Sequence, residues 1–173
     1  MAYTYSLLAS STVGAGGASA ITFNNIPQNY TDLVVKVSLR NTAADTNTDT
    51  KITFNGSTSG YSARRITGSG TAAGSVTQSP TDAIYFGLPG EGTLWTVSTF
   101  ANGEMYIPNY TSSNNKSISL DGVAENNGTA AAAHFAAALW SNSVAINQIT
   151  LTSGNGNWAQ YTTATLYGIR VEL

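Results

Sequence analysis

Cysteine is absent from this chain of 173 residues, and charged residues are scarce. Without cysteine, no disulfide can hold the fold and no thiol can act as a nucleophile or metal ligand. Asp, Glu, Lys and Arg make up 9% of the residues, against about 25% in ordinary soluble domains. Net charge is −2, and the only adjacent basic pair is Arg64 and Arg65. A partner made of nucleic acid is therefore not expected.

Long apolar runs and histidines are scarce as well. No stretch approaches 18 consecutive apolar residues, so neither a membrane-spanning helix nor a membrane partner is predicted. The first residues carry no basic group ahead of a short apolar run, so no signal peptide is predicted. With so few charges, the surface repels neighbouring copies weakly. The composition favours a protein that packs against copies of itself or against another protein.

Short β-favouring segments, separated by turns rich in glycine and asparagine, are the main pattern that is present. Their regular spacing predicts an all-β fold, an antiparallel β-sandwich of jelly-roll type with about nine or ten strands. We find no linker, so residues 1–173 are expected to form a single β-sandwich domain. The expected segments are 19–23, 33–40, 50–54, 82–86, 93–100, 104–107, 116–124, 146–152 and 163–171.

Alternation within these segments predicts which side chains are buried. In 33–40, "LVVKVSLR", the odd-numbered residues are all apolar and form the expected buried face, while Val34 and Lys36 fall on the other face. The predicted core positions are Ile21, Phe23, Leu33, Val35, Val37, Ile52, Phe54, Ile118, Leu120, Ile149, Leu151 and Leu166.

The alanine-rich segment 129–142, "TAAAAHFAAALWSN", contains the only histidine, His134. Alanine is the best helix former, so propensity favours a helix. The neighbouring segments are all strand-like and the run lacks Lys and Glu, so we favour a strand. As a strand it places Phe135 on one face and His134 on the other, with alanines on both. Both faces are then expected to be covered.

No motif in the sequence supports catalysis. The stretch Gly60–Arg64, "GYSAR", starts like a nucleophile elbow but lacks its final glycine. Gly68–Gly74, "GSGTAAG", resembles a phosphate-binding loop but has no lysine after it. We interpret the first as a strand after a turn and the second as a flexible loop. His134 is expected to be a packed or interface histidine, with no catalytic residues elsewhere.

Acidic residues raise two further possibilities, both of which we reject. Asp45, Asn47 and Asp49 match the first ligands of a calcium loop, but Thr50 and Gly56 stand where that loop needs its glycine and its glutamate. Glycoside hydrolysis needs two carboxylic acids in one cleft. The candidates for such a pair are widely spaced: Glu91, Glu104, Asp121 and Glu125. We expect a protein that is not an enzyme, with no metal and no cofactor.

Four residues are the candidates for binding a partner protein: Tyr61, Arg64, Arg65 and Trp158. Trp158 lies in a polar segment, "GNGNWAQY", where an exposed aromatic ring could contact a partner or a sugar. Adjacent residues of a strand point to opposite faces, so only one of the two arginines can reach a given acidic surface.

Four blocks of sequence resemble a known family. They are "ITFNNIPQNYTDLVVKVSLRNT", "FNGSTSGYSARRITGSG", "EMYIPNYTSSNNKSISLDGVAENN" and "ALWSNSVAINQITLTSGNGNWAQYTTATLYGI". Together they run from about Ile21 to Ile169, and their order and spacing are similar to those of small structural proteins of tailed bacteriophages, common in phages of aquatic bacteria.

This resemblance implies a virion component without a catalytic motif. One reading is a capsid decoration, or cement, protein that binds the outside of the head and bridges capsomers. The alternative is a tail-fibre or spike adhesin that binds a host glycan or receptor. We favour the first, because the chain is compact and has no stalk-like repeat. The expected partners are other copies of the chain, as a homotrimer, and the major capsid protein or other virion proteins. In the adhesin alternative, the partner is a host glycan.

Overall fold

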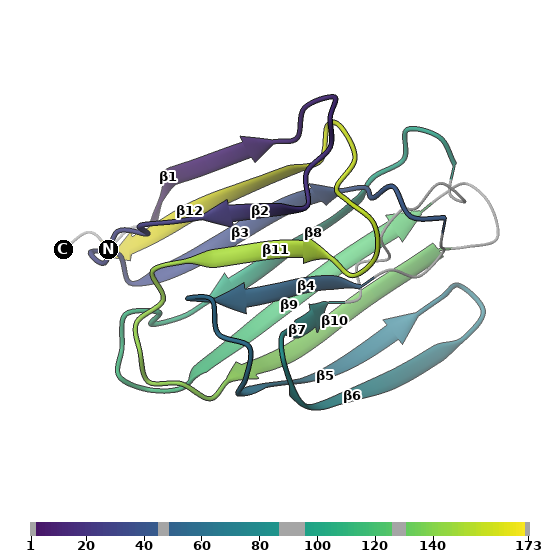
Figure 1. Ribbon diagram of the computed structural model, residues 1–173. Coiled ribbons are helices and arrows are strands. Elements are labelled where there is room, and N and C mark those ends of the chain that lie inside the picture. Colours follow the sequence, from purple (N-terminus) through teal and green to yellow (C-terminus); the bar gives the residue numbers. More distant parts are fainter. Residues whose placement is uncertain (1–2, 45–48, 87–95, 126–130, 172–173) are drawn as a thin grey trace.

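The computed structural model of the protein describes residues 3–44, 49–86, 96–125 and 131–171, and all regular structure in them is β-strand (Figure 1). The strands are β1 (Tyr3–Thr12), β2 (Ala20–Phe23), β3 (Asp32–Leu39), β4 (Thr50–Phe54), β5 (Tyr61–Gly68), β6 (Ala73–Thr81), β7 (Ile84–Phe86), β8 (Ala101–Ile107), β9 (Lys116–Glu125), β10 (Ala131–Trp140), β11 (Ile149–Ser153) and β12 (Thr163–Val171).

Eight of these strands pair in a nested order. β1 pairs with β12, β2 with β11, β3 with β8 and β4 with β7, all antiparallel. Successive pairs alternate between two sheets, β1-β12-β3-β8 in the larger and β2-β11-β4-β7 in the smaller. This is the strand order of an eight-stranded jelly roll, so the expected β-sandwich is confirmed.

The other four strands widen the larger sheet on one side only. β9 follows β8 in the sheet, and the order continues through β10 and β5 to β6 at the edge. We call β9, β10, β5 and β6 the extension. The larger sheet therefore has eight strands and the smaller four, and the β5–β6 hairpin lies at the far edge of the larger sheet (Figure 1).

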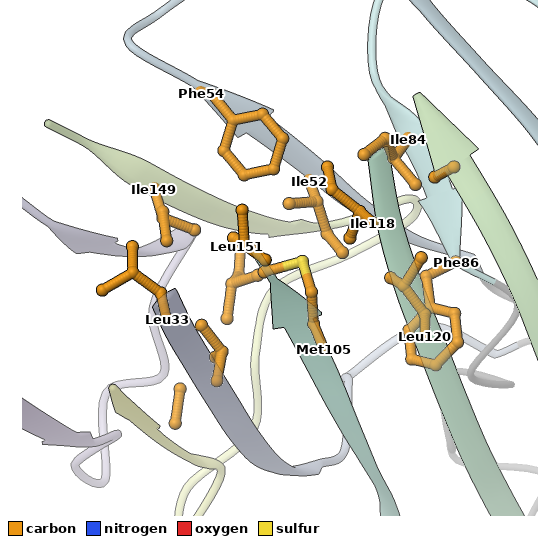
Figure 2. Close-up of a cluster of buried hydrophobic side chains, with 14 of the residues drawn as sticks. Leu33, Ile52, Phe54, Ile84, Phe86, Met105, Ile118, Leu120, Ile149 and Leu151 are labelled. Carbon is orange, nitrogen blue, oxygen red and sulfur yellow. The ribbon is translucent and has the colours of Figure 1, made fainter. Parts of the chain in front are cut away.

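The core lies between the two sheets. Figure 2 shows side chains from β3, β8 and β9 of the larger sheet meeting those from β4, β7 and β11 of the smaller one. Every predicted core position is buried except Val37, which is partly buried against the cluster. At one end, Trp140 stacks on Tyr61 with ring centroids 6.0 Å apart and packs against Phe54 at 5.5 Å. These aromatic rings join the extension to the jelly roll.

The alanine-rich segment is a strand, as the sequence indicated, but it is not covered on both faces. In β10, Ala136, Ala138 and Trp140 are buried against the core, on the face shared with His134. Phe135 on the opposite face is 56% exposed. The expectation of two covered faces is therefore wrong.

Other expectations also need correction. The number of strands is twelve: eight of the nine segments are strands, the expected strands at β5 and β10 add two, and β1 and β6 were not anticipated. Of the expected strand 93–100, residues 93–95 lie outside the described residues, and Thr96–Phe100 form a turn. Val34, expected on the exposed face, is fully buried, since it lies between its register partners Tyr106 and Tyr167.

Candidate functional site

The larger sheet has an inner face, packed on the smaller sheet, and an outer face that no described residue covers as a second layer. In β9 the alternation is complete: every second residue is buried and those between are exposed. On the extension, the outer face carries Val123, Phe135 and Ile66, which are 47%, 56% and 61% exposed. Phe135 and Ile66 are register partners across β10 and β5.

Small side chains precede and follow Phe135 on the outer face of its own strand. Ala133 and Ala137 lie two residues before and after Phe135 on the same strand face, and both are exposed. Phe135 therefore stands above a low, apolar surface. We call Ile66, Val123, Ala133, Phe135 and Ala137 the outer patch. Exposed apolar side chains that adjoin one another on a flat sheet mark a surface suited to protein contact.

An acidic group borders the outer patch on its β9 side. Asp121 is the register partner of Phe135 on one side and of Glu104 on the other. Burial, and then the negative charge of Glu104, raise the pKa of the Asp121 carboxyl above its ordinary value. Lys36 Nζ lies 3.1 Å from Glu104, whereas Asp121 has no ion pair with any described residue. The positive charge of Lys36 opposes this rise in pKa in part, but the Lys36 ammonium is bound to Glu104 and not to Asp121.

A cation borders the same patch on its β5 side. Arg64 precedes Ile66 on the same face of β5 and is the register partner of Ala137. Its guanidinium Nη1 donates to the backbone oxygens of Ala63 at 3.0 Å and Gln78 at 3.4 Å. None of the described carboxylates forms an ion pair with Arg64.

The two adjacent arginines point to opposite faces, as predicted. Arg65 lies on the inner face, where its Nη1 is 2.8 Å from Asp49 Oδ1 and its side chain is 13% exposed. Arg65 is therefore engaged within the molecule, and Arg64 is the arginine available to an external acidic group. Asp45 and Asn47 of the rejected calcium loop lie outside the described residues.

Tyr61 and Trp158, the aromatic candidates for partner binding, are fully buried. The Tyr61 hydroxyl accepts a hydrogen bond from the backbone nitrogen of Phe54 at 2.8 Å, and burial raises its pKa. Trp158 Nε1 donates to the oxygen of Leu151 at 3.1 Å. The expected exposure of Trp158 is wrong: its flanking loop is polar, but its ring belongs to the core.

His134 lies on the inner face of β10, between Gly122 on β9 and Thr67 on β5. Burial, and then the positive charge of Arg65, lower its pKa to about 4, and Asp49 opposes this in part. Its Nδ1 is buried without a hydrogen-bond partner among the described residues. A group with so low a pKa is a poor general base at neutral pH.

The structure brings together one pair of carboxylates that the sequence left apart, Glu104 and Asp121. They lie side by side on the open outer face, and Lys36 binds one of them, so they do not form the enclosed pair that glycoside hydrolysis needs. Glu91 lies outside the described residues. Within the described part of the chain, no group of three His, Cys, Asp or Glu side chains could hold a metal ion. The Gly68–Gly74 segment joins β5 to β6 through a turn in which Ser69 N donates to Ala72 O at 2.9 Å.

The outer patch was not predicted from the sequence. Alternation in the alanine-rich segment places Phe135 and His134 on opposite faces of the strand. This signal would have predicted an exposed Phe135 ring if both faces had not been expected to be covered. No protein-family model matches the chain, no curated protein matches its sequence, and no solved structure matches its fold. No helix in the described ranges is long and apolar enough to cross a membrane.

Proposed function

We propose that the protein is a non-enzymatic structural component of a bacteriophage virion, a decoration protein that binds the outside of the head and bridges capsomers. The observation that carries this proposal is the outer patch, an apolar surface bordered by Arg64 and Asp121, neither of which forms an ion pair with a described residue. Such a surface suits protein contact better than catalysis.

Two further features support a structural role. The chain has few charges to keep copies apart. Its four sequence blocks resemble small structural proteins of tailed bacteriophages.

The test is binding of the purified protein to phage heads stripped of their outer proteins, measured by co-sedimentation. We expect saturable binding at a fixed ratio to the major capsid protein, and no binding to host polysaccharide on a glycan array. Binding to polysaccharide without binding to heads would overturn the decoration role and favour a tail-fibre adhesin.

A further inference from the structure

We propose that the outer patch is the contact with a second copy of this chain, with β10 against β10 around a two-fold axis. This inference rests on the proposed function in treating the protein as one that assembles, and it assigns the outer patch to the contact between copies, so that the head is bound through other surfaces of the dimer. It concerns the isolated chain, so it is measured without particles and stands or fails separately from head binding.

The arrangement of charge identifies the occupant. Across the patch the order is acid, apolar, base: Asp121 on β9, Phe135 on β10 and Arg64 on β5. A two-fold axis along β10 lays β9 of one copy over β5 of the other. Under this rotation Ile66 of one copy lies opposite Asp121 of the other. Arg64 lies two residues before Ile66 on β5, a distance of about 7 Å along the strand that an arginine side chain can span. Each dimer then gains two equivalent Arg64–Asp121 ion pairs.

The shape of the patch fits the same rotation. Phe135 lies close to the proposed axis, and Ala133 and Ala137 flank it on the strand. Under this rotation each residue of β10 lies opposite the same residue of the other copy, so the two Phe135 rings meet beside the axis. The alanines before and after them leave space around this aromatic contact.

The area of the face is sufficient for a stable contact. The strands β8, β9, β10, β5 and β6 lie side by side. With strands about 4.8 Å apart and about 30 Å long, this face covers about 700 Å² in each copy, or about 1,400 Å² in total. Standard protein interfaces bury about 1,200 to 2,000 Å² in total. The contact also gives Asp121 an ion pair, which it does not form with any described residue.

Sedimentation velocity over a range of protein concentrations tests the contact. We expect the wild type to form a dimer, and Phe135→Asp to raise the dimer dissociation constant at least about 100-fold. Leu7→Asp is the matched control: Leu7 is 64% exposed on the outer face of β1, at the opposite edge of the sheet. This control is expected to dimerise like the wild type. Far-UV circular dichroism verifies that both variants fold.

A charge exchange tests the ion pair. We expect Arg64→Glu and Asp121→Arg each to weaken the dimer about 10-fold or more, and the double variant to recover most of that loss. Failure of the double variant to recover would overturn the pairing. The outer patch would not be the contact between copies if the wild type stayed monomeric. The same would follow if Leu7→Asp broke the association and Phe135→Asp did not. The homotrimer expected from the sequence would also contradict this contact, because a two-fold contact closes at two copies.

Discussion

His134 couples the stability of the fold to pH. In the folded protein its pKa is about 4, below the ordinary value of 6.5, because burial and Arg65 disfavour the charged ring. Between these two values the unfolded chain binds a proton that the folded chain does not. Stability is therefore lost as pH falls from about 6.5 to about 4, and this contribution is constant below that.

Replacing His134 with glutamine removes this titration. Since solvent screens a half-buried group, we expect the wild type to lose about 1 to 2 kcal/mol more than His134→Gln between pH 7 and pH 4. The measurement is the free energy of unfolding in urea at a series of pH values for both proteins. Carboxylates titrate in both and cancel in the difference. Two parallel curves would contradict the neutral, buried ring.

Lys116 is a buried cation held by backbone carbonyls. It is 1% exposed, and Nζ donates to Ser112 O at 2.8 Å, Asn114 O at 2.6 Å and Asn142 O at 3.4 Å. Burial lowers the pKa of the ammonium. The side chain ties the loop after β8 to the end of β10.

Substitution of Lys116 by methionine keeps the aliphatic stem and leaves these carbonyls without their donor. We expect a loss of about 2 to 4 kcal/mol in the free energy of unfolding. Lys51→Met is the control, because Lys51 is only partly buried, with Nζ 4.0 Å from Asp82 and 5.0 Å from the centroid of the Tyr85 ring, and it should cost about 1 kcal/mol or less. An equal loss of unfolding free energy in the two variants would show that water takes the place of the ammonium as the donor to these carbonyls.

At the scale of single elements, β12 depends on a glycine covered by an aromatic ring. A Cβ built on Gly168 would lie 2.5 Å from Cγ of Tyr30. Tyr30 also lies under the Arg170 guanidinium, 5.0 Å from the ring centroid, which limits how far the ring can move away.

Gly168→Ala should therefore destabilise the protein by about 1 to 3 kcal/mol, as overpacking does. In a Tyr30→Ala background the same substitution should cost much less, because the ring it meets is gone. Gly14→Ala is the control, since a Cβ added at Gly14 would have no neighbouring atom within 4 Å. Thermal unfolding of these variants and the wild type gives the comparison. If Gly168→Ala destabilised the Tyr30→Ala variant as much as it destabilises the wild type, the cause would lie in the backbone of β12 and not in the Tyr30 ring.

Strand-level expectations succeeded where alternation was regular and failed where it was interrupted. β9 and β11 alternate without a break and were predicted. β1 was missed because a register shift between Leu7 and Ala9 breaks its period of two. β6 was missed because glycine, serine and proline disfavour strands, yet an edge strand that pairs with β5 alone tolerates them.

The turn at Thr96–Phe100 shows the opposite failure, a β-favouring sequence that is not a strand. Arg40 Nη1 donates to Thr96 O at 3.0 Å and to Thr99 O at 2.8 Å, and Ser98 has a positive φ of 64°. Contacts from a distant strand fix this conformation, so local propensity could not reveal it.

The candidate site was out of reach of the sequence for a related reason. Asp121 and Arg64 lie far apart along the chain, and they flank Phe135 only because β10 inserts between β9 and β5. Alternation gives the face of each side chain within its own strand. It does not give the order of the strands, which is what places the acid on one side of the ring and the base on the other.

For the whole molecule, the two sheets are expected to unfold together, because one core joins them. Leu33→Ala removes a fully buried side chain and should cost about 2 to 5 kcal/mol. Leu7→Ala, at a 64% exposed position, should cost less than about 1 kcal/mol. Urea unfolding followed by tryptophan fluorescence and by circular dichroism should give coincident transitions for both. Separate transitions would mean that the extension and the jelly roll are independent units.

The nested strand order also governs when the protein can fold. As the chain emerges from the ribosome, β2 must wait for β11 and β1 must wait for β12, so neither sheet of the jelly roll closes before those late strands have been synthesised. Pairings between strands so distant in sequence form slowly, on a scale of about milliseconds to seconds. Until then the apolar side chains of β2 and β3 stay exposed to other growing chains. The rate at which folded protein becomes available therefore depends on the pairing of these distant strands as well as on synthesis.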